Sequence, residues 1–496
     1  MSKLNSFLFL KKGFQNPAII GVVLSIISVL ITYSKNWILT RSFSPEEYGY
    51  FIYISTIISW IVTIATSGLN NGVLSYLITF NKKEEQKSIV GWVLGLSIKR
   101  GLIGILISIV FFLFILSPKS NDSSFLYFSI VILMPISISI SILSSTMVYQ
   151  GYVVLNNLVN IVIINGGTLL FFIFLHFYGF TFYGLALASV LPVVLANFYM
   201  TKKTNCTPIF NRKVLDESTK KSILYTSNKI LFSGLLYAFW IKAESFFLQM
   251  NCGEGCVAYF YVPFQFSFLL TMVNTVMYGV VSSKLAYYEG GSIDQEILYN
   301  KSSNFIFYIN LLLFFFLYIN AFDLLSIFGS NYANDQSVFV IRLLSLSFLL
   351  YSYFGATAEV YMNMLNKNIY LLYSALLTFC ISIVSNLIFT LNFGVKGAAI
   401  SFTVTILSTS IIRSYYIRKK FFYKISLLSP VIIYTIISVP VLEIVSYFSA
   451  KIDNIYLRVI FSNSILLASV ILVLIINYEN VLNNFKYFGI KKESEI

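Results

Sequence analysis

Long apolar runs separated by short polar turns fill most of the chain. Each run has about 20 residues or more, the length that a helix needs to cross the hydrocarbon layer. The runs are continuous and do not alternate with a period of two, which argues against a β-barrel. Fourteen spans are predicted, at 17–40, 49–78, 90–117, 125–149, 155–176, 180–200, 223–250, 257–284, 302–322, 335–362, 367–391, 395–417, 427–449 and 456–477. The pattern therefore predicts an all-α polytopic membrane protein with about 14 transmembrane helices.

A polar segment from Arg41 to Phe51 separates the first two runs. Ser44 suits the N-cap of a helix, Pro45 suits its first position, and Glu47 lies three residues after the cap. Together they form a capping box. The segment predicts a tight hairpin whose second helix begins near Pro45.

Charge follows the hydropathy pattern. Only 11% of the 496 residues are charged, against roughly 25% in a soluble protein. The formal net charge is +14, and Lys and Arg gather in both tails and in the loops of one side. The positive-inside rule therefore predicts that both termini are cytoplasmic. The basic excess is then a topology signal that matches an anionic inner leaflet, and it does not indicate a nucleic-acid partner.

The order of the first six spans recurs in the next six. Three stretches align at a nearly constant offset: Tyr48–Phe51 with Val257–Phe260, Leu155–Asn157 with Leu365–Lys367, and Gly184–Ser189 with Gly397–Ser401. Because six is even, both halves have the same topology, which predicts a parallel repeat about an axis along the membrane normal. Such proteins commonly place a substrate path between the halves and alternate access by rocking one half against the other.

The repeat predicts four regions. They are an N-terminal six-helix bundle at 1–200, a basic cytoplasmic linker at 201–222, a C-terminal six-helix bundle at 223–425, and two additional helices with a cytoplasmic tail at 426–496.

Charged side chains inside the spans are the candidate site residues. Such charges are costly in lipid and tend to face a bundle interior or a water-filled cavity. Basic residues outnumber acidic ones among them, which suits an anionic head group such as a phosphate or pyrophosphate. The candidate substrate-binding residues are Arg41, Lys99, Arg100, Lys242 and Arg342, and the candidate ion-coupling residues are Glu244 and Glu359.

Simpler roles stay open for several of these residues. Lys99 and Arg100 lie at the inner surface if the third span begins at Gly101. Glu244 and Glu359 are either proton or sodium sites or salt-bridge partners. Lys242 and Glu244 are two residues apart, about 200° round a helix, so they cannot pair with each other.

Other chemistry is sparse in the sequence. Four cysteines are too few for a disulfide scaffold or a metal cluster. Cys252 and Cys256 share a short loop and are interpreted as ordinary small residues, unless that loop faces an oxidising compartment. No Gly-x-x-x-x-Gly-Lys phosphate loop is present, and the outer loops are short, so we expect neither an enzyme nor a cofactor or metal. Kinks are predicted at the prolines inside spans, Pro135, Pro192, Pro263 and Pro440.

Two motifs resemble a known family. The Arg-x-x-Ser-Pro-Glu-Glu-Tyr-Gly hinge at 41–49 is similar to the hinge of bacterial polysaccharide flippases of the multidrug/oligosaccharidyl-lipid/polysaccharide exporter superfamily. The stretch Lys242–Leu248 with Gly253–Tyr259 resembles that family's pattern of an acidic residue, an apolar run, Gly and Tyr. Glu244 stands where an Asp is common. The resemblance covers roughly residues 15–420.

The resemblance implies a MATE-like arrangement of the repeats and a role in polysaccharide biosynthesis. These flippases move an undecaprenyl-pyrophosphate-linked oligosaccharide, such as an O-antigen, lipopolysaccharide or capsule unit, to the outer leaflet of the cytoplasmic (inner) membrane by alternating access. The implied partners are that unit, membrane lipid, a polysaccharide polymerase and a chain-length regulator. The alternatives are another exporter of the superfamily, namely a drug or cation antiporter or a lipid II flippase, and a membrane-embedded polymerase or transferase.

Overall fold

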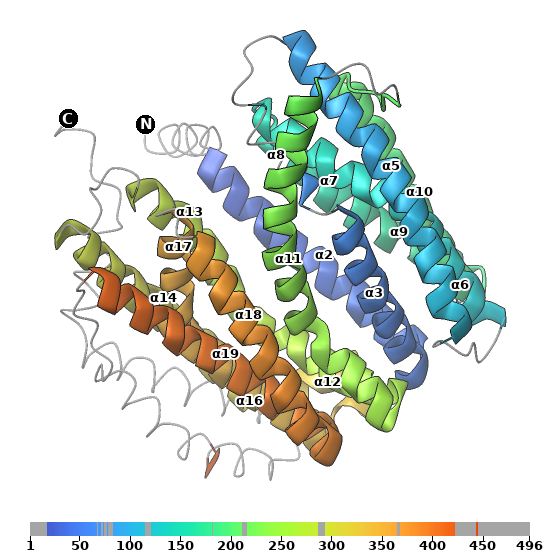
Figure 1. Ribbon diagram of the computed structural model, residues 1–496. Coiled ribbons are helices and arrows are strands. Elements are labelled where there is room, and N and C mark those ends of the chain that lie inside the picture. The colour runs from blue at the N-terminus through green and yellow to red at the C-terminus, as the bar shows by residue number, and fades with distance from the viewer. Residues whose placement is uncertain are drawn as a thin grey trace, which may run out of the picture. The chain divides into compact units, whose positions relative to one another are not determined.

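The structure is a computed structural model that describes residues 17–66, 68–70, 73, 77, 83–114, 121–180, 182–210, 216–285, 293–364, 368–421 and 443–444. All secondary structure in these residues is helical. Packing divides the chain into two units (Figure 1). Unit 1 comprises Met1–Ser44 and Phe51–Lys242, and unit 2 comprises Pro45–Tyr50 and Ala243–Ile496.

Unit 1 is a bundle of the first helices. Its elements are α2 (Pro17–Ser42), most of α3 (Pro45–Thr66), α5 (Lys83–Phe114), α6 (Asn121–Ile132), α7 (Met134–Tyr149), α8 (Val153–Leu158), the π-helix η1 (Val159–Gly166), α9 (Gly167–Phe177), α10 (Phe182–Thr204) and most of α11 (Glu217–Cys252). The helix α10 packs against α6, α7 and α9, and α5 packs against α7.

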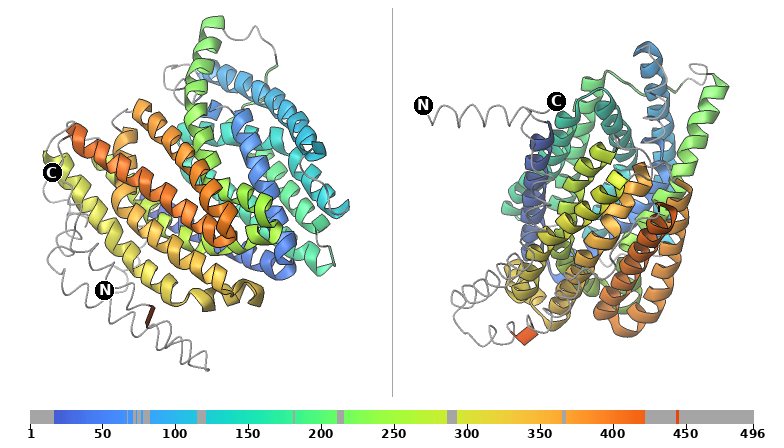
Figure 2. Two further views of the ribbon diagram at one scale, coloured as in Figure 1. Left: turned by 60° about the horizontal axis from the view of Figure 1, so that its bottom comes forward. Right: turned by 90° about the vertical axis from the view of Figure 1, so that its left-hand side faces the viewer.

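Unit 2 is a bundle of the later helices. Its elements are the end of α11, α12 (Glu254–Phe268), α13 (Leu270–Leu285), α14 (Ile293–Ile319), α15 (Ala321–Phe328), η3 (Ser330–Tyr332), α16 (Asp335–Tyr351), η4 (Ser352–Ala356), α17 (Thr357–Met364), α18 (Asn368–Ser385), η5 (Asn386–Thr390) and α19 (Leu391–Phe421). The helix α16 packs against α12, α14 and α19, and α18 packs against α19. Figure 2 shows two further views of the helices.

The helices have the length and composition of membrane spans. In the described part of the chain, seven helices are long and apolar enough to cross a membrane, or up to nine when each of two bent pairs counts as one span. The span Val153–Phe177 is only 17% buried, and Leu170, Phe174 and Phe177 on it are exposed. Such an apolar exterior suits lipid and not water. The predicted spans at 427–449 and 456–477 lie outside the described residues except at 443–444.

Helix boundaries differ from the hydropathy pattern at two early spans. The second span was expected at 49–78, and α3 begins at Pro45, as the capping box predicts, and runs to Thr66. Gly68 follows with φ of 65°, a left-handed conformation that ends a helix. Among the residues described after Gly68, Leu69, Asn70, Val73 and Leu77 are helical too. The third span was expected from 90, whereas α5 begins at Lys83. The first turns of α5 are polar, and a hydropathy pattern detects only the apolar segment that follows them.

Two predicted spans are bent in the structure. The span expected at 125–149 consists of α6 and α7, which meet at 40°. Pro135 lies in the first turn of α7, so the predicted kink is confirmed there. The span expected at 257–284 consists of α12 and α13, which meet at 45° beside Leu269, whereas Pro263 lies inside α12. The helix α10 runs through Pro192 without a break, and Pro440 lies outside the described residues.

The hinge packs against its own second copy in unit 2. A Cβ atom on Gly49 would collide with the carbonyl oxygen of Glu254 and would lie 3.3 Å from the backbone nitrogen of Ala258. Ala258 is the residue that aligns with Gly49 in the sequence repeat. Tyr48 is fully buried, and Gln265 on α12 donates a hydrogen bond of 3.2 Å to its hydroxyl. The hinge is therefore a point of close helix packing.

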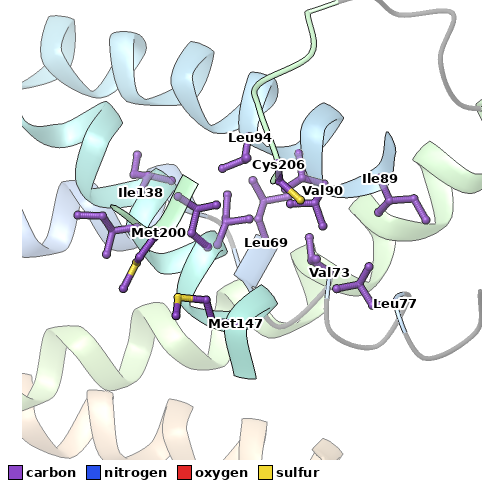
Figure 3. Close-up of a cluster of buried hydrophobic side chains, with 14 of the residues drawn as sticks. Leu69, Val73, Leu77, Ile89, Val90, Leu94, Ile138, Met147, Met200 and Cys206 are labelled. Carbon is purple, nitrogen blue, oxygen red and sulfur yellow. The ribbon is translucent and has the colours of Figure 1, made fainter. Parts of the chain in front are cut away.

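The linker between the halves is bound to α5 in unit 1. Ile209 N donates a hydrogen bond of 2.8 Å to Gly91 O. A Cβ on Gly91 would lie 2.8 Å from Thr207 O, and one on Gly95 would collide with Ile209 O. The two glycines, one helical turn apart, let an extended segment lie directly on the helix. Figure 3 shows the apolar core beside this segment, including Leu94, Ile138 and Met200.

Candidate functional site

A carboxyl group of unit 2 is enclosed in the structure. Glu244 on α11 is 1% exposed. Its Oε1 accepts a hydrogen bond of 3.4 Å from Asn386 Nδ2, and its Oε2 has no hydrogen-bond partner among the described residues. Asn386 is the first residue of the π-helix η5 at the end of α18. A π-helix shifts the register of the side chains that follow, and such bulges frequently occur at functional sites.

Asn386, the partner of this carboxyl group, belongs to a larger set of buried polar side chains. Thr390 Oγ1 donates to Asn386 Oδ1 at 2.7 Å, and Asn386 Nδ2 also donates to Ser382 O at 2.9 Å. Further along, the Ser385 hydroxyl lies 2.8 Å from that of Ser401. These buried groups form a polar network that connects α11, α18, η5 and α19.

The arrangement suits exchange of a proton or a small cation. An isolated carboxylate enclosed to this degree costs far more free energy than a protonated carboxyl or a carboxylate that holds a cation. No salt bridge to Glu244 occurs in the described part of the chain.

The second candidate acid is already paired. Glu359 Oε2 lies 2.6 Å from Arg413 Nη1, and the hydroxyl of Tyr351 donates to the same oxygen at 3.1 Å. Arg413 is 7% exposed. The helix α19 approaches η4 closely here, since a Cβ on Gly355 would lie 2.6 Å from Ser410 Oγ. The salt-bridge interpretation of Glu359 therefore fits its geometry.

Arg342 on α16 is also paired. Its Nη1 lies 3.1 Å from Glu443 Oε2, and its Nε donates to Tyr318 O at 3.3 Å. The Tyr318 hydroxyl donates to Glu443 Oε1 at 2.7 Å, and the guanidinium lies 4.9 Å from the Tyr318 ring centroid. Glu443 thus neutralises the guanidinium that was expected to bind substrate.

Two cations inside unit 1 lack an acidic partner in the described residues. Arg100 is half-buried on α5, and its Nη1 is enclosed without a hydrogen-bond partner among those residues. Lys242, half-buried on α11, donates to Ser59 Oγ at 3.1 Å. Trp60 beside Ser59 donates to Ala238 O at 2.9 Å and stacks on Phe239 at 4.2 Å between centroids. The Ser59 hydroxyl that accepts from the ammonium group is therefore next in sequence to an aromatic contact between α3 and α11.

The remaining candidates lie at the surface of unit 1. Lys99 is exposed, with its Nζ 5.9 Å from the Phe210 ring centroid. Arg41 is exposed at the end of α2, with its guanidinium 5.7 Å from the Trp37 ring centroid. Within each unit, the described contacts join none of the seven candidates to another. Four of them, Arg41, Lys99, Arg100 and Lys242, belong to unit 1, and Glu244, Arg342 and Glu359 belong to unit 2.

A disulfide closes the turn between α11 and α12. Cys252 and Cys256 are bonded, with their Cα atoms 6.0 Å apart. The interpretation of both as ordinary small residues is therefore wrong. The turn begins at Gly253, whose φ of 84° favours glycine.

Known structures identify the fold. No family model and no curated protein matches this chain. An inward-facing structure of a multidrug resistance MATE family transporter of the MOP superfamily aligns with a TM-score of 0.63 at 16% identity, covering 82% of this chain and 98% of that one. The chain has a MATE-like transporter fold.

Two further structures align with this MATE-like fold over 82% of the present chain and 96% of their own, both at 16% identity. One is an outward-facing conformation of a multidrug resistance MATE family transporter, with a TM-score of 0.61. The other, with a TM-score of 0.58, is a MOP superfamily transporter from Pyrococcus furiosus Vc1 whose binding pocket has reverse polarity, which suggests a different function for that protein. The predicted all-helical, MATE-like architecture is confirmed.

Sequence reasoning missed the partners of the candidate acids, Asn386 and Arg413. One signal was available. Ser382, Asn386 and Thr390 recur every four residues in an otherwise apolar span, and Ser401 and Thr405 do so in the next. Polar residues at this spacing share one helix face and predict a polar contact between spans.

Proposed function

We propose that this chain is a membrane exporter that flips an undecaprenyl-pyrophosphate-linked oligosaccharide to the outer leaflet of the bacterial inner membrane by alternating access. The MATE-like fold supports a transporter, since its solved relatives include inward-facing and outward-facing conformations. The motifs at 41–49 and 242–259 resemble those of the polysaccharide flippases and support an oligosaccharide substrate. The polar sugar would cross through protein while the polyprenyl tail stays in the bilayer.

The inference that the substrate is an anion rests on two basic side chains of unit 1. Arg100 and Lys242 lie within predicted spans, and neither has a carboxylate within ion-pair distance in the described part of the chain. Unpaired cations at membrane depth are costly unless an anion or water meets them. A guanidinium and an ammonium would bind a pyrophosphate through charge-assisted hydrogen bonds. Arg342, neutralised by Glu443, plays a structural part in this proposal.

In the same proposal Glu244 couples transport to an ion. Its enclosed carboxyl would take up a proton or a small cation in one state and release it in the other. A membrane potential that is negative inside adds about 2.3 kcal/mol per charge per 100 mV to outward movement of an anion. Binding of the head group by unit 1 and of the coupling ion by unit 2 would divide the two tasks between the halves.

The alternative is export of cationic drugs, which the multidrug transporters among the matching structures suggest. A drug cation would need a cavity lined by acidic residues. The enclosed Glu244 is an acidic residue that could serve in such a cavity. The reverse-polarity pocket of the Pyrococcus transporter supports the view that this fold accommodates pockets of different charge. The basic residues of unit 1 therefore favour the anionic substrate.

Deletion of the gene tests the proposal. We expect the lipid-linked unit to be made but to stay in the inner leaflet, inaccessible to an impermeant glycosidase or lectin added to spheroplasts, and the wild-type gene to restore access. If the unit reaches the outer leaflet without the gene, or if only drug susceptibility changes, the flippase proposal is wrong.

The basic residues are tested by substitution in the same assay. Arg100→Gln and Lys242→Gln should each lower the rate of unit export by about tenfold or more, the effect of losing one charge-assisted contact of roughly 1.5–3 kcal/mol. Lys419→Gln removes an exposed charge from the end of α19 and should export normally. Equal amounts of each variant in the membrane, measured by immunoblot, separate transport from insertion.

A further inference from the structure

A polar cavity of about 410 Å³ lies in unit 1 where α5, α7, α10 and the start of the linker meet. Leu77, Val90 and Cys206, labelled in Figure 3, supply apolar parts of its lining. Its volume lies within the range of sites for small molecules, about 300–1,000 Å³. The proposed transport path uses none of its residues.

The charge of the cavity is positive. Lys87 on α5 and Lys203 on α10 line it, and no carboxylate does so among the described residues. Lys203 Nζ lies 4.7 Å from the ring centroid of Tyr152, which also lines the cavity. Burial raises the pKa of the Cys206 thiol, so this group stays neutral and does not offset the lysines. Such a lining favours an anion.

Amide and hydroxyl groups complete the lining. Gln86 Nε2 donates to the Tyr149 hydroxyl at 2.8 Å, which in turn donates to Leu77 O at 2.8 Å, so one wall is fixed by internal hydrogen bonds. Gln150 and Asn205 are exposed and present further amide groups. Amides pair with hydroxyl groups as both donors and acceptors.

The depth of the cavity matches the polar surface of a membrane. Lys87 precedes the predicted span 90–117, Tyr149 ends the span 125–149, and Lys203 follows the span 180–200. All three therefore lie at one end of their helices, where lipid head groups are found. Basic pockets between helices at this level bind anionic head groups.

We propose that this cavity binds a phosphate-bearing, hydroxyl-rich head group of the kind that phosphatidylglycerol carries. The two lysines would bind the phosphate, and the amides of Gln150 and Asn205 would bind the glycerol hydroxyls. A neighbouring cavity of about 280 Å³ has Lys99, Lys220 and Lys221 in its lining, but it also contains Glu217, which pairs with Lys220 at 2.8 Å. The cavity with Lys87 and Lys203 has no such internal counter-ion in its described lining.

The test compares the full-length protein in nanodiscs of phosphatidylcholine with and without phosphatidylglycerol. We expect phosphatidylglycerol to raise the melting temperature and to be retained by the protein in native mass spectrometry. Lys87→Gln and Lys203→Gln should each weaken retention about five- to tenfold. Lys202→Gln removes the adjacent, exposed charge of α10, which does not line the cavity, and should retain the lipid as the wild type does.

A second arm identifies the source of the ligand. Glycerol 1-phosphate added to phosphatidylcholine nanodiscs raises the melting temperature if a free phosphorylated polyol is accepted, and this shift should also disappear in Lys203→Gln. Gln150→Leu keeps both lysines and should lower the preference for phosphatidylglycerol over phosphatidic acid, which lacks the glycerol hydroxyls. The proposal is wrong if neither phosphatidylglycerol nor glycerol 1-phosphate stabilises the protein beyond phosphatidylcholine alone. It is also wrong if Lys202→Gln and Lys203→Gln weaken the retention of phosphatidylglycerol equally. Transport is not measured, so the outcome is independent of the flippase proposal.

Discussion

Glu244 is the residue on which ion coupling depends in the proposed mechanism. Glu244→Gln keeps the shape of the side chain and the hydrogen bond to Asn386 but cannot lose a proton or hold a cation as a carboxylate does. We expect normal membrane insertion and an unchanged or higher melting temperature, because a buried amide costs less than a buried carboxylate. The initial rate of transport should fall by about tenfold or more and should no longer respond to an imposed proton or sodium gradient. Flux measured in proteoliposomes under each gradient checks this.

Asp335→Asn is the matched control for that substitution. It makes the same acid-to-amide change at an exposed position in the first turn of α16, where a carboxylate stabilises the helix by only about 0.3–1 kcal/mol. It should leave the gradient dependence intact. If the transport rate of the Glu244→Gln protein still responds to an imposed gradient, Glu244 does not couple transport to the ion.

The pairing of a side chain was predictable where its spacing along one helix determines it. The pairing was not predictable where the partner lies far away in the sequence. Lys242 and Glu244 were expected not to pair because of their helical spacing, and the structure confirms this with separate partners, Ser59 and Asn386. Asn386 lies 142 residues from Glu244 in sequence. No local pattern names such a partner, since a buried acid is satisfied equally well by any polar group that the fold brings within reach.

At the scale of helices, the contact between α3 and α12 depends on Gly49. Any Cβ there collides with the backbone carbonyl of Glu254, which cannot move without displacing α12. Gly49→Ala should therefore destabilise the protein by about 1–3 kcal/mol, lowering the melting temperature by several degrees. Gly234→Ala on α11 is the control, because a Cβ there meets nothing within 4 Å, and it should be neutral or slightly stabilising. Equal melting temperatures for the two variants, measured in one detergent, would show that the close packing at Gly49 is unimportant.

Hydropathy locates helices better than it locates their interruptions. The break at Gly394, with φ of 56°, falls in the connection predicted between 391 and 395. The bend at Leu133 was signalled by Pro135, but the bend at Leu269 and the π-helix η5 carry no proline or glycine signal. Such interruptions are set by packing against neighbouring helices, so apolar content alone does not reveal them.

For the whole molecule, the sequence repeat predicts a recurring order of helices, but it does not predict where packing divides the chain into two units. The boundary between the units falls at Lys242 inside α11, and Pro45–Tyr50 of α3 belongs to unit 2. A continuous helix carries no local mark of such a boundary, because it depends on which distant helices each turn contacts. The six-helix composition of each half, and the two helices beyond 425, stay predictions.

Orientation in the membrane is the remaining property of the whole molecule, and the disulfide makes it testable. The distribution of Lys and Arg predicts that the Cys252–Cys256 turn faces the outside and that the linker faces the cytoplasm, and an oxidising compartment is where a disulfide persists. In a variant with Cys206 and Cys380 replaced by serine, an impermeant maleimide should label intact spheroplasts only after treatment with an impermeant reductant. Thr207→Cys, added with both cysteines of the disulfide replaced, places an exposed thiol on the linker and should react only after lysis. Labelling of Thr207→Cys from outside would invert the topology, and with it the direction in which the proposed substrate is carried.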